Sequence, residues 1–183
     1  PNTKDKLFKN FWPASLHVIG KDILRFHAIY WPAFLLAAGI EPPSRIFSHG
    51  WILSDDEKMS KSKGNILDPI EIIDIYGIDE LRYYLMKEVS HGSDGSISLK
   101  NLQNCINSDL ANNYGNLCQR VFSFIKNNCN SEVKKTKNLS EADKDLVSKS
   151  NALTKDLRSF MDKQNLNSYI KSVIDISFLT NKY

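Results

Sequence analysis

Cysteine is scarce in this chain of 183 residues, and its three copies are widely spaced. Cys105, Cys118 and Cys129 stand 13 and 11 residues apart, which is neither a CxxC pair nor an even-numbered disulfide framework. We therefore expect a reducing compartment and no zinc site. The sequence also lacks a signal-peptide pattern and any apolar run of the roughly 18 residues needed to cross a bilayer. These absences argue against a membrane protein and against a secreted disulfide scaffold.

An excess of charge of one sign is also missing. The 24 Lys and Arg residues and 21 Asp and Glu residues give a net charge of +3, which permits an anionic partner without requiring one. Hydrophobic residues make up 42% of the chain and charged residues 25%, a composition typical of a folded globular protein. The sequence starts at Pro1 and ends at Tyr183 directly after an apolar helical pattern, so we expect it to be a piece of a longer protein.

The N-terminal part of the chain predicts a parallel sheet. Residues 16–19 are an apolar run that ends at Gly20, as in a buried strand that leads into a helix. Between residues 21 and 38 apolar side chains recur at intervals of three and four, which predicts a helix that Pro32 should kink or divide. Further strands are expected at residues 45–49 and 51–54. A strand, a crossover helix and a second strand form the βαβ unit of a parallel sheet.

The remainder of the chain predicts helices. Asp68, Pro69 and Glu71 together indicate a helix start, with a capping side chain, a proline in the first turn and an acidic residue behind it. Two short helices are expected before the loop Ser90–Ser96, whose glycines and serines make it the best candidate for a domain boundary. Apolar spacing beyond this loop predicts a series of antiparallel helices.

The expected fold class is α/β followed by all-α. We expect residues 1–64 to be the C-terminal part of a Rossmann-like parallel-sheet domain, and residues 65–97 to be a connecting helical region. Residues 98–183 are expected to form a truncated antiparallel helix bundle. The chain would then contain parts of two domains.

The most informative segment is the string KMSKS at residues 58–62, followed directly by Lys63, Gly64 and Asn65. Three lysines within six positions, separated by small hydroxyl residues and closed by a glycine, predict a mobile cationic loop. Such a loop suits a polyphosphate whose charge changes during a reaction, because it can close on the phosphates and then release them. The alternative is a lysine-rich loop that is merely solvated, as most charge runs are.

The KMSKS string resembles the second signature of class I aminoacyl-tRNA synthetases. Three further passages extend the resemblance along the chain to methionyl-tRNA synthetase: HVIGKDI with FHAIYWPA in 17–33, FSHGW in 47–51 with GIDELRYY in 77–84, and NSDLANNxGNLxxR in 107–120. The first and last of these select the methionine family, because KMSKS also fits leucyl, isoleucyl and valyl enzymes. The first class I signature, His-x-Gly-His, is absent, since Lys21 stands where its second histidine is required.

The resemblance implies a methionine–tRNA ligase, which activates methionine with ATP and transfers it to tRNA(Met). Lys61 matches the family's phosphate-contacting lysine and is expected to stabilise the transition state, with Lys58 and Lys63 as auxiliaries. We expect ATP to arrive with Mg²⁺ as a substrate, and no metal site made by this chain. The expected partners are tRNA(Met), ATP and L-methionine, with no membrane. A monomer in the bacterial cytoplasm is expected, with the mitochondrial matrix as the alternative. Without the first signature, the chain alone is expected to be inactive.

The resemblance also implies the small-molecule contacts. The expected ATP-binding residues are Gly20, Asp22, Gly50, Trp51 and Ile52, together with Lys58 and Lys61. The expected methionine-binding residues are Asp22, Ile23, His27 and Trp31, of which the last three follow at four-residue steps and should share a helix face. Helix capping is the alternative for Asp22, and packing in the core is the alternative for His27 and Trp31.

Asn116 and Arg120 are the expected tRNA contacts. They are four residues apart, hence on one helix face, and lie beside the apolar stripe. An amide and a guanidinium in such a position can read unstacked bases, and the resemblance implies contact with the CAU anticodon. The alternative is an exposed hydrogen-bonded pair. Two other functions also stay open: a tRNA-binding fragment without catalysis, and another class I synthetase of the leucyl, isoleucyl or valyl type.

Overall fold

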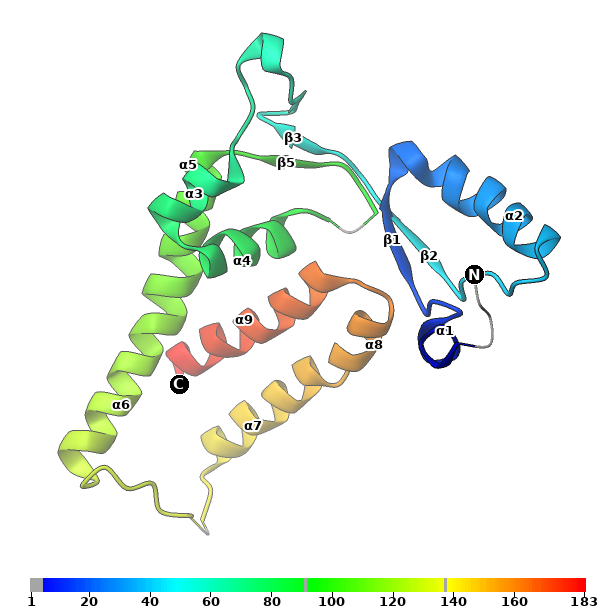
Figure 1. Cartoon of the computed structure of the whole chain (residues 1–183). Helices are drawn as coiled ribbons and strands as arrows, with labels where there is room; N and C mark the ends of the chain where they lie inside the picture. Colours follow the sequence, from blue (N-terminus) through cyan, green and yellow to red (C-terminus); the bar gives the residue numbers. More distant parts are fainter. Residues whose placement is uncertain (1–4, 91, 137) are drawn as a thin grey trace.

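The structure is a computed structural model that describes residues 5–90, 92–136 and 138–183, except the side chain of Lys61. Figure 1 shows two small sheets with a helical connection at one end, and a set of longer helices at the other. A short helix, α1 (Lys6–Phe11), precedes the first sheet. In the described ranges, no helix is long and apolar enough to cross a membrane.

The first sheet is the predicted βαβ unit. β1 (His17–Gly20) pairs in parallel with β2 (Ile46–His49), with Gly20 opposite His49. The connection between the strands is helical, in the order η1 (Lys21–Ile23), η2 (Phe26–Tyr30) and α2 (Trp31–Ala37). The predicted parallel pairing is therefore confirmed.

The connecting helix is divided where the proline was expected to divide it. η2 is a π-helical turn, in which Trp31 N–H bonds to the Phe26 carbonyl five residues back. Pro32 occupies the first turn of α2, where its missing N–H is tolerated. The wider π turn passes directly into this proline, so one predicted helix becomes three segments with different pitch.

The second sheet differs from the prediction. Its central strand, β3 (Ile52–Ser54), pairs antiparallel with β4 (Glu57–Lys58) and in parallel with β5 (Gly95–Ile97). The third predicted strand, β3, therefore belongs to a sheet separate from that of β1 and β2. The interpretation of Ser90–Ser96 as a loop was wrong for its last two residues, which begin β5, and residue 91 lies outside the described part.

The main hydrophobic core lies between the second sheet and the helices that follow it. α3 (Pro69–Tyr76) begins as predicted, with the Asp68 carboxylate accepting from Ile70 N–H at 2.8 Å. α4 (Ile78–Glu88) and α5 (Leu99–Cys105) pack beside it. The buried residues of this core are Ile72, Leu81, Tyr84, Ile97, Leu102 and Cys105. The lysine-rich segment is thus attached to the best-packed part of the molecule.

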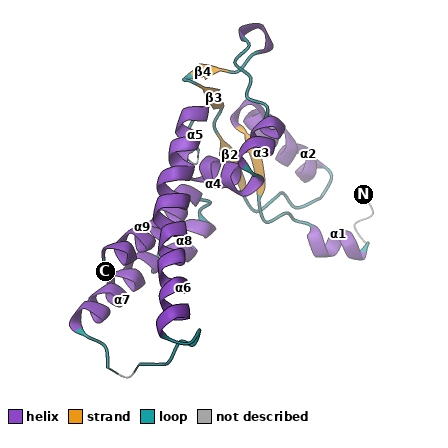
Figure 2. Ribbon diagram, turned by 90° about the vertical axis from the view of Figure 1, so that its left-hand side faces the viewer, coloured by secondary structure: helices purple, strands orange, loops and turns teal. Residues whose placement is uncertain are grey.

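The C-terminal part is the predicted helix bundle. α5 continues through η4 (Ile106–Gly115), a π-helical stretch, into α6 (Asn116–Asn128), and the three form one long rod (Figure 2). α7 (Glu141–Thr154) starts with a capping box, continues as α8 (Leu157–Asp162), and the chain returns as α9 (Leu166–Lys182). α9 contacts α4, α6, α7, α8 and η4, so it is the central helix of this part.

Candidate functional site

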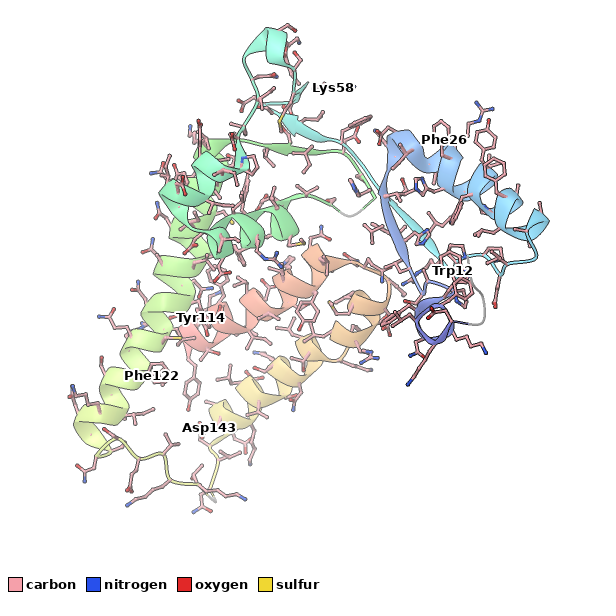
Figure 3. All side chains as sticks on the ribbon, viewed as in Figure 1. Trp12, Phe26, Lys58, Tyr114, Phe122 and Asp143 are labelled. Atoms are coloured by element: carbon pink, nitrogen blue, oxygen red, sulfur yellow. The ribbon has the colours of Figure 1, made fainter. Side chains whose placement is uncertain are left out.

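A tight hairpin presents the lysine-rich segment at the edge of the second sheet. Asp55 and Asp56 both have positive φ angles, 49° and 66°, the sign that a two-residue type I′ turn requires. Asp56 N–H donates to Ser96 Oγ at 2.8 Å, which ties the turn to β5. Lys58 ends β4, and the chain then projects away from both sheets (Figure 3).

The side chain of Asn65 closes this projecting segment, residues 58–65, which we call the lysine loop. Its Oδ1 accepts from Ser60 N–H at 2.9 Å, and its Nδ2 donates to the Lys58 carbonyl at 3.3 Å. A single amide therefore holds both ends of the loop together. The few hydrogen bonds of such a loop make it easy to rearrange around a ligand.

The lysines of the loop differ in their surroundings. Lys63 Nζ lies 2.7 Å from Glu57 Oε2, and both side chains are more than half exposed. An exposed pair of this kind is worth about 0.2–1 kcal/mol, so a phosphate can displace it. Lys61 begins η3 (Lys61–Lys63), but its side chain lies outside the described part of the structure. The role predicted for Lys61 stays a prediction.

Trp51 lies next to two ammonium groups. Lys58 Nζ lies 4.5 Å and Lys21 Nζ lies 5.9 Å from the centroid of the Trp51 ring, both within cation–π range. Asp94 accepts from Lys21 Nζ at 2.5 Å and from Trp51 N–H at 2.8 Å. These two bonds hold the pKa of Asp94 below its ordinary value, and the bond from Lys21 has the larger effect. Lys21, which follows β1, and Trp51, which follows β2, thus lie beside Lys58 of β4.

Sequence reasoning missed Lys21 and Asp94 as members of this cluster. The position of Lys21 was a usable signal, because a charged residue directly after a buried strand lies at the ligand-binding edge of a parallel sheet. Asp94 carried no such signal, since it stands 73 residues from Lys21 in a segment interpreted as a loop.

Two glycines allow close approach at the same edge. A Cβ at Gly20 would lie 2.5 Å from Asp22 Oδ1, and a Cβ at Gly50 would lie 2.2 Å from the Ser93 carbonyl oxygen. The neighbour of Gly50 is backbone, which cannot rotate away as a side chain can. Because Gly20 pairs with His49, the predicted nucleotide contacts Gly20 and Asp22 lie near Gly50 and Trp51, whereas Ile52 begins β3 of the second sheet.

Asp22 does not cap a helix. The N-caps of η1 and η2 are Gly20 and Arg25, and neither helix has a side-chain capping bond. The alternative interpretation of Asp22 was therefore wrong. Its carboxylate lies exposed at the carboxyl end of β1, beside Gly20.

An open apolar cavity of about 840 Å³ lies between β1 and the helical connection. Its lining residues are Leu16, His17, Val18, Ile19, Phe26, His27, Tyr30, Trp31 and Phe34. Trp31 also packs edge-on against Trp12, with ring centroids 6.2 Å apart. His27 Nδ1–H donates to the Ile23 carbonyl at 3.0 Å, which leaves Nε2 as the acceptor of that ring.

Two of the three residues predicted to share the methionine-binding face lie together. His27 and Trp31 line the cavity, whereas Ile23 is absent from its lining because it lies in the preceding 3₁₀ turn. A helix of constant pitch would have aligned all three. The change from 3₁₀ to π geometry breaks that alignment.

Asn116 and Arg120 lie on the rod far from the lysine loop, in the region of Tyr114 and Phe122 in Figure 3. Both are exposed, and they do not bond to one another: Asn116 Nδ2 donates to the Asn112 carbonyl at 3.2 Å, and Arg120 Nη2 donates to Asn181 Oδ1. The alternative of a hydrogen-bonded Asn–Arg pair was therefore wrong.

An ion pair between a buried carboxylate and a partly exposed lysine joins the two parts of the molecule. Asp109 of η4 is 5% exposed, and its Oδ2 lies 2.8 Å from Lys87 Nζ and 2.7 Å from Tyr83 Oη. Burial acts to raise the pKa of Asp109, but bonds from Lys87, Tyr83 and Ser108 outweigh it and keep that pKa below its ordinary value. Burial likewise lowers the pKa of Lys87, yet its contacts with Asp109 and Glu88 leave that pKa raised.

The described side chains at this edge of the sheet are cationic, aromatic and apolar. No group of His, Cys, Asp or Glu among the described residues could hold a metal ion. The three cysteines are free, with Cys105 buried beside Asp109. Lysines, an aromatic ring and an apolar cavity instead surround the carboxyl ends of β1 and β2.

Comparison with known proteins assigns this arrangement to a family. The family model described as tRNA synthetases class I (M) matches residues 1–122. Methionine–tRNA ligase of Brucella suis is 45% identical over 183 residues, and that of Mycobacterium tuberculosis is 44% identical. The chain belongs to the methionyl-tRNA synthetase family. The resemblance of the sequence to the methionine family is thereby confirmed.

Solved structures of this family share the fold. Mycobacterium tuberculosis methionyl-tRNA synthetase in complex with methionyl-adenylate has a TM-score of 0.95 at 44% identity, over 100% of this chain and 36% of that one. The free-state structure of the same synthetase has a TM-score of 0.89 at 40% identity. The predicted fold class is confirmed. The chain spans about a third of the length of the curated relatives it matches, 35% for Brucella suis.

Proposed function

We propose that this chain is the segment of a methionine–tRNA ligase that binds the phosphates of ATP at one end and the anticodon of tRNA(Met) at the other. In the reaction, a carboxylate oxygen of methionine attacks the α-phosphorus of Mg²⁺-bound ATP and releases pyrophosphate. The terminal ribose hydroxyl of tRNA then attacks the carbonyl carbon of methionyl adenylate and releases AMP. The protein supplies position and charge in both steps.

The observation that carries this proposal is the cluster at the carboxyl ends of β1 and β2. Lys21 and Lys58 approach Trp51 there, and the lysine loop begins at Lys58. Open parallel sheets bind ligands at this edge. A mobile loop with several ammonium groups can neutralise the charge that develops as pyrophosphate leaves.

The proposed nucleotide contacts are those that the family resemblance implies. We assign transition-state stabilisation to Lys61, with Lys58 and Lys63 as auxiliaries. Gly20, Asp22, Gly50, Trp51 and Ile52 complete the ATP-binding set. Mg²⁺ enters with ATP, as its substrate complex.

The methionine side chain is proposed to bind in the apolar cavity. An unbranched thioether fits a site with aromatic walls, and His27 and Trp31 contribute such walls here. Asp22 lies at the end of β1 nearby, where its carboxylate can attract the methionine amine. Ile23 remains in the proposed methionine-binding set, because its carbonyl accepts the hydrogen bond from His27 Nδ1–H.

The helical part is proposed to bind the CAU anticodon through Asn116 and Arg120. We keep the proposed division into residues 1–64, the connecting region 65–97 and the anticodon-binding bundle 98–183, although β5 pairs with β3 across the first boundary. Because methionine charging serves protein synthesis, we place the activity in the bacterial cytoplasm, or alternatively in the mitochondrial matrix, in a monomeric enzyme.

The test needs the parts of the enzyme that this chain does not cover. A chimaera in which this chain replaces its matching segment in the Brucella suis relative supplies them. Lys61→Ala should slow methionine-dependent pyrophosphate exchange by orders of magnitude and leave methionine affinity unchanged, because the lysine acts on the phosphates. Lys135→Ala, in the exposed segment between α6 and α7, is the matched control. Exchange at the unsubstituted rate in Lys61→Ala would refute the role of the loop.

The second candidate, a tRNA-binding fragment without catalysis, describes the chain on its own. Its sequence lacks the His-x-Gly-His signature, while both the lysine loop and the Asn116–Arg120 face are present. The isolated chain should therefore bind tRNA(Met) and show no pyrophosphate exchange. Measurable exchange by the isolated chain would contradict this expectation.

A further inference from the structure

Asn181, near the end of α9, has an amide whose orientation is fixed by its neighbours. Its Nδ2 donates to Asn113 Oδ1 at 2.6 Å, to the Asn113 carbonyl at 3.1 Å and to the Ser177 carbonyl at 3.0 Å. All three partners are oxygen acceptors, so the reversed amide would set oxygen against oxygen. Asn181 Oδ1 must therefore face the other way, toward α6.

The residues behind Asn181 are buried and fully bonded. Asn113 is 3% exposed, and its Nδ2 donates to Ser177 Oγ at 2.7 Å. Ser177 Oγ in turn donates to the Ile174 carbonyl at 2.8 Å. Buried polar groups with every partner in place give a rigid arrangement, because breaking any bond leaves a group desolvated and unpaired.

Arg120 is held by the outward-facing oxygen of this network. Its Nη2 donates to Asn181 Oδ1, from α6 across to α9. An exposed arginine otherwise has many rotamers, and ordering such a side chain costs conformational entropy. Contact with Asn181 engages one nitrogen of the planar fork, and the other N–H groups of Arg120 have no hydrogen-bond partner among the described residues.

The two predicted anticodon-reading residues are thus held in different ways. Asn116 bonds only to its own helix, through the Asn112 carbonyl, in the contacts that the described residues give it. Arg120 is instead fixed by a second helix. A guanidinium that reads a base edge needs a fixed plane, because its two N–H groups must meet two acceptors at once.

We propose that Asn181 is a positioning residue for anticodon recognition: it sets the plane of Arg120 and does not itself contact the RNA. This inference rests on the anticodon role proposed for Arg120. It adds that specificity depends on α9, and on the buried Asn113 behind it, as well as on α6.

A double-mutant cycle tests this in the Brucella chimaera. The quantity measured is the ratio of kcat/KM for charging tRNA(Met) with CAU to that for single-base anticodon variants. Arg120→Ala should lower this ratio by roughly 5- to 150-fold at one base. Asn181→Ala should lower it about tenfold at the same base, and pyrophosphate exchange without tRNA should stay unchanged. In the Arg120→Ala background, Asn181→Ala should have no further effect, because its route to the RNA is gone.

Further variants separate positioning from damage to the fold. Asn181→Gln keeps both polar groups and moves them outward by one methylene, so it should give a smaller loss at the same base. Asn128→Ala removes an exposed asparagine of α6 whose side chain, among the described residues, bonds only to the Phe124 carbonyl, and it should change neither the ratio nor its base dependence. Thermal unfolding of each variant reports on the fold.

The outcomes distinguish a failure of this inference from a failure of the anticodon role proposed for Arg120. An unchanged ratio in Arg120→Ala refutes the anticodon role of that residue, and the inference falls with it. If Arg120→Ala lowers the ratio but Asn181→Ala has no effect, the positioning role alone is overturned. The same holds if the effects of the two substitutions are additive. Loss at every base to an equal degree also overturns it, because a fixed guanidinium plane acts on one base edge.

Discussion

At the scale of single residues, the candidate nucleotide site depends on the absence of a side chain at Gly50. A side chain there would press on the backbone of Ser93 and Asp94, at 2.2 Å from the Ser93 carbonyl oxygen and 2.5 Å from the Asp94 amide nitrogen. Asp94 holds both Lys21 and the Trp51 amide. A shift of the segment that contains Ser93 and Asp94 would therefore separate the groups that surround the proposed phosphate site.

Gly50→Ala should lower the free energy of unfolding by about 3 kcal/mol, the upper part of the range for overpacking. The fluorescence of Trp51 should change as well, because its Asp94 contact is strained. Gly39→Ala is the control: its Cβ would meet nothing within 4 Å, but φ is +68°, so about 1–2 kcal/mol is expected without a change at Trp51. Urea unfolding and fluorescence measure both effects, and equal results for the two variants would contradict the steric argument.

At the scale of elements, the contact between α4 and η4 joins the sheet region to the rod. The buried carboxylate of Asp109 pairs there with the partly exposed Lys87, and Tyr83 is a third partner. Removing one member of a buried pair leaves an unpaired charge, which is more damaging than losing an exposed pair. The junction should therefore be sensitive to a single substitution.

Lys87→Met should lower the free energy of unfolding at neutral pH by about 3–5 kcal/mol. Lys171→Met is the matched control, because Lys171 pairs with Asp175 at 2.7 Å on an exposed surface. That variant should lose about 0.2–1 kcal/mol. Denaturant unfolding compares the two, and similar losses would show that the buried pair contributes no more than a surface pair.

The pH dependence of this junction has a definite sign. In the unsubstituted chain the pKa of Asp109 lies below its unfolded value, so its contribution is present above the ordinary carboxyl range and is lost as pH falls. The raised pKa of Lys87 means that its contribution is present below the ordinary lysine pKa and is lost as pH rises above it. In Lys87→Met the buried carboxylate prefers to be neutral, so the penalty of the substitution should shrink on acidification. A penalty that is constant from neutral to acid pH would contradict the pairing.

Elements that follow from local patterns could be predicted, and those that depend on distant partners could not. β1, β2 and β3 and the starts of α3 and α7 follow from apolar runs and capping residues. β4 and β5 were missed because each is two or three residues long and exists through its pairing with β3. The π segments were missed because ten residues of η4 differ little in periodicity from an α-helix.

The candidate site shows the same division. KMSKS, Gly20, Asp22 and the Asn116–Arg120 spacing are visible in the sequence, either as a family motif or as helix periodicity. Asn181 and Lys87 act through partners 61 and 22 residues away, so no local pattern marks them. The location of the Lys61 side chain is the part of the predicted site that the structure leaves undescribed.

At the scale of the whole molecule, packing is uneven. The largest buried cluster joins α3, α4, β5 and α5, whereas the β1–β2 unit contributes Ile19 and Leu35 as its buried apolar residues. Its cavity walls are exposed, with Val18 at 60% and Phe34 at 67%. Low burial predicts low local stability, so this end of the chain should open more readily than the rod.

Hydrogen exchange should reveal that difference. Amides of β1, β2 and α2 should exchange faster in the isolated chain than those of α4, η4 and α9, because fewer apolar contacts oppose their opening. In the Brucella chimaera, the β1 and α2 amides should become protected if the rest of the enzyme covers the cavity. Mass spectrometry of proteolytic fragments measures both states. Equal protection of the two regions in the isolated chain would refute the ranking.

The π-helical stretch η4 places a limit on how this protein can vary in length. Successive residues of a helix advance by about 100° around its axis, so deleting or inserting one residue between Asp109 and Asn113 would turn everything beyond it by that angle. Asp109 meets α4 and Asn113 meets α9, and only the present count of residues satisfies both at once. Insertions and deletions should therefore be tolerated in the connection between α6 and α7, but excluded from these few residues.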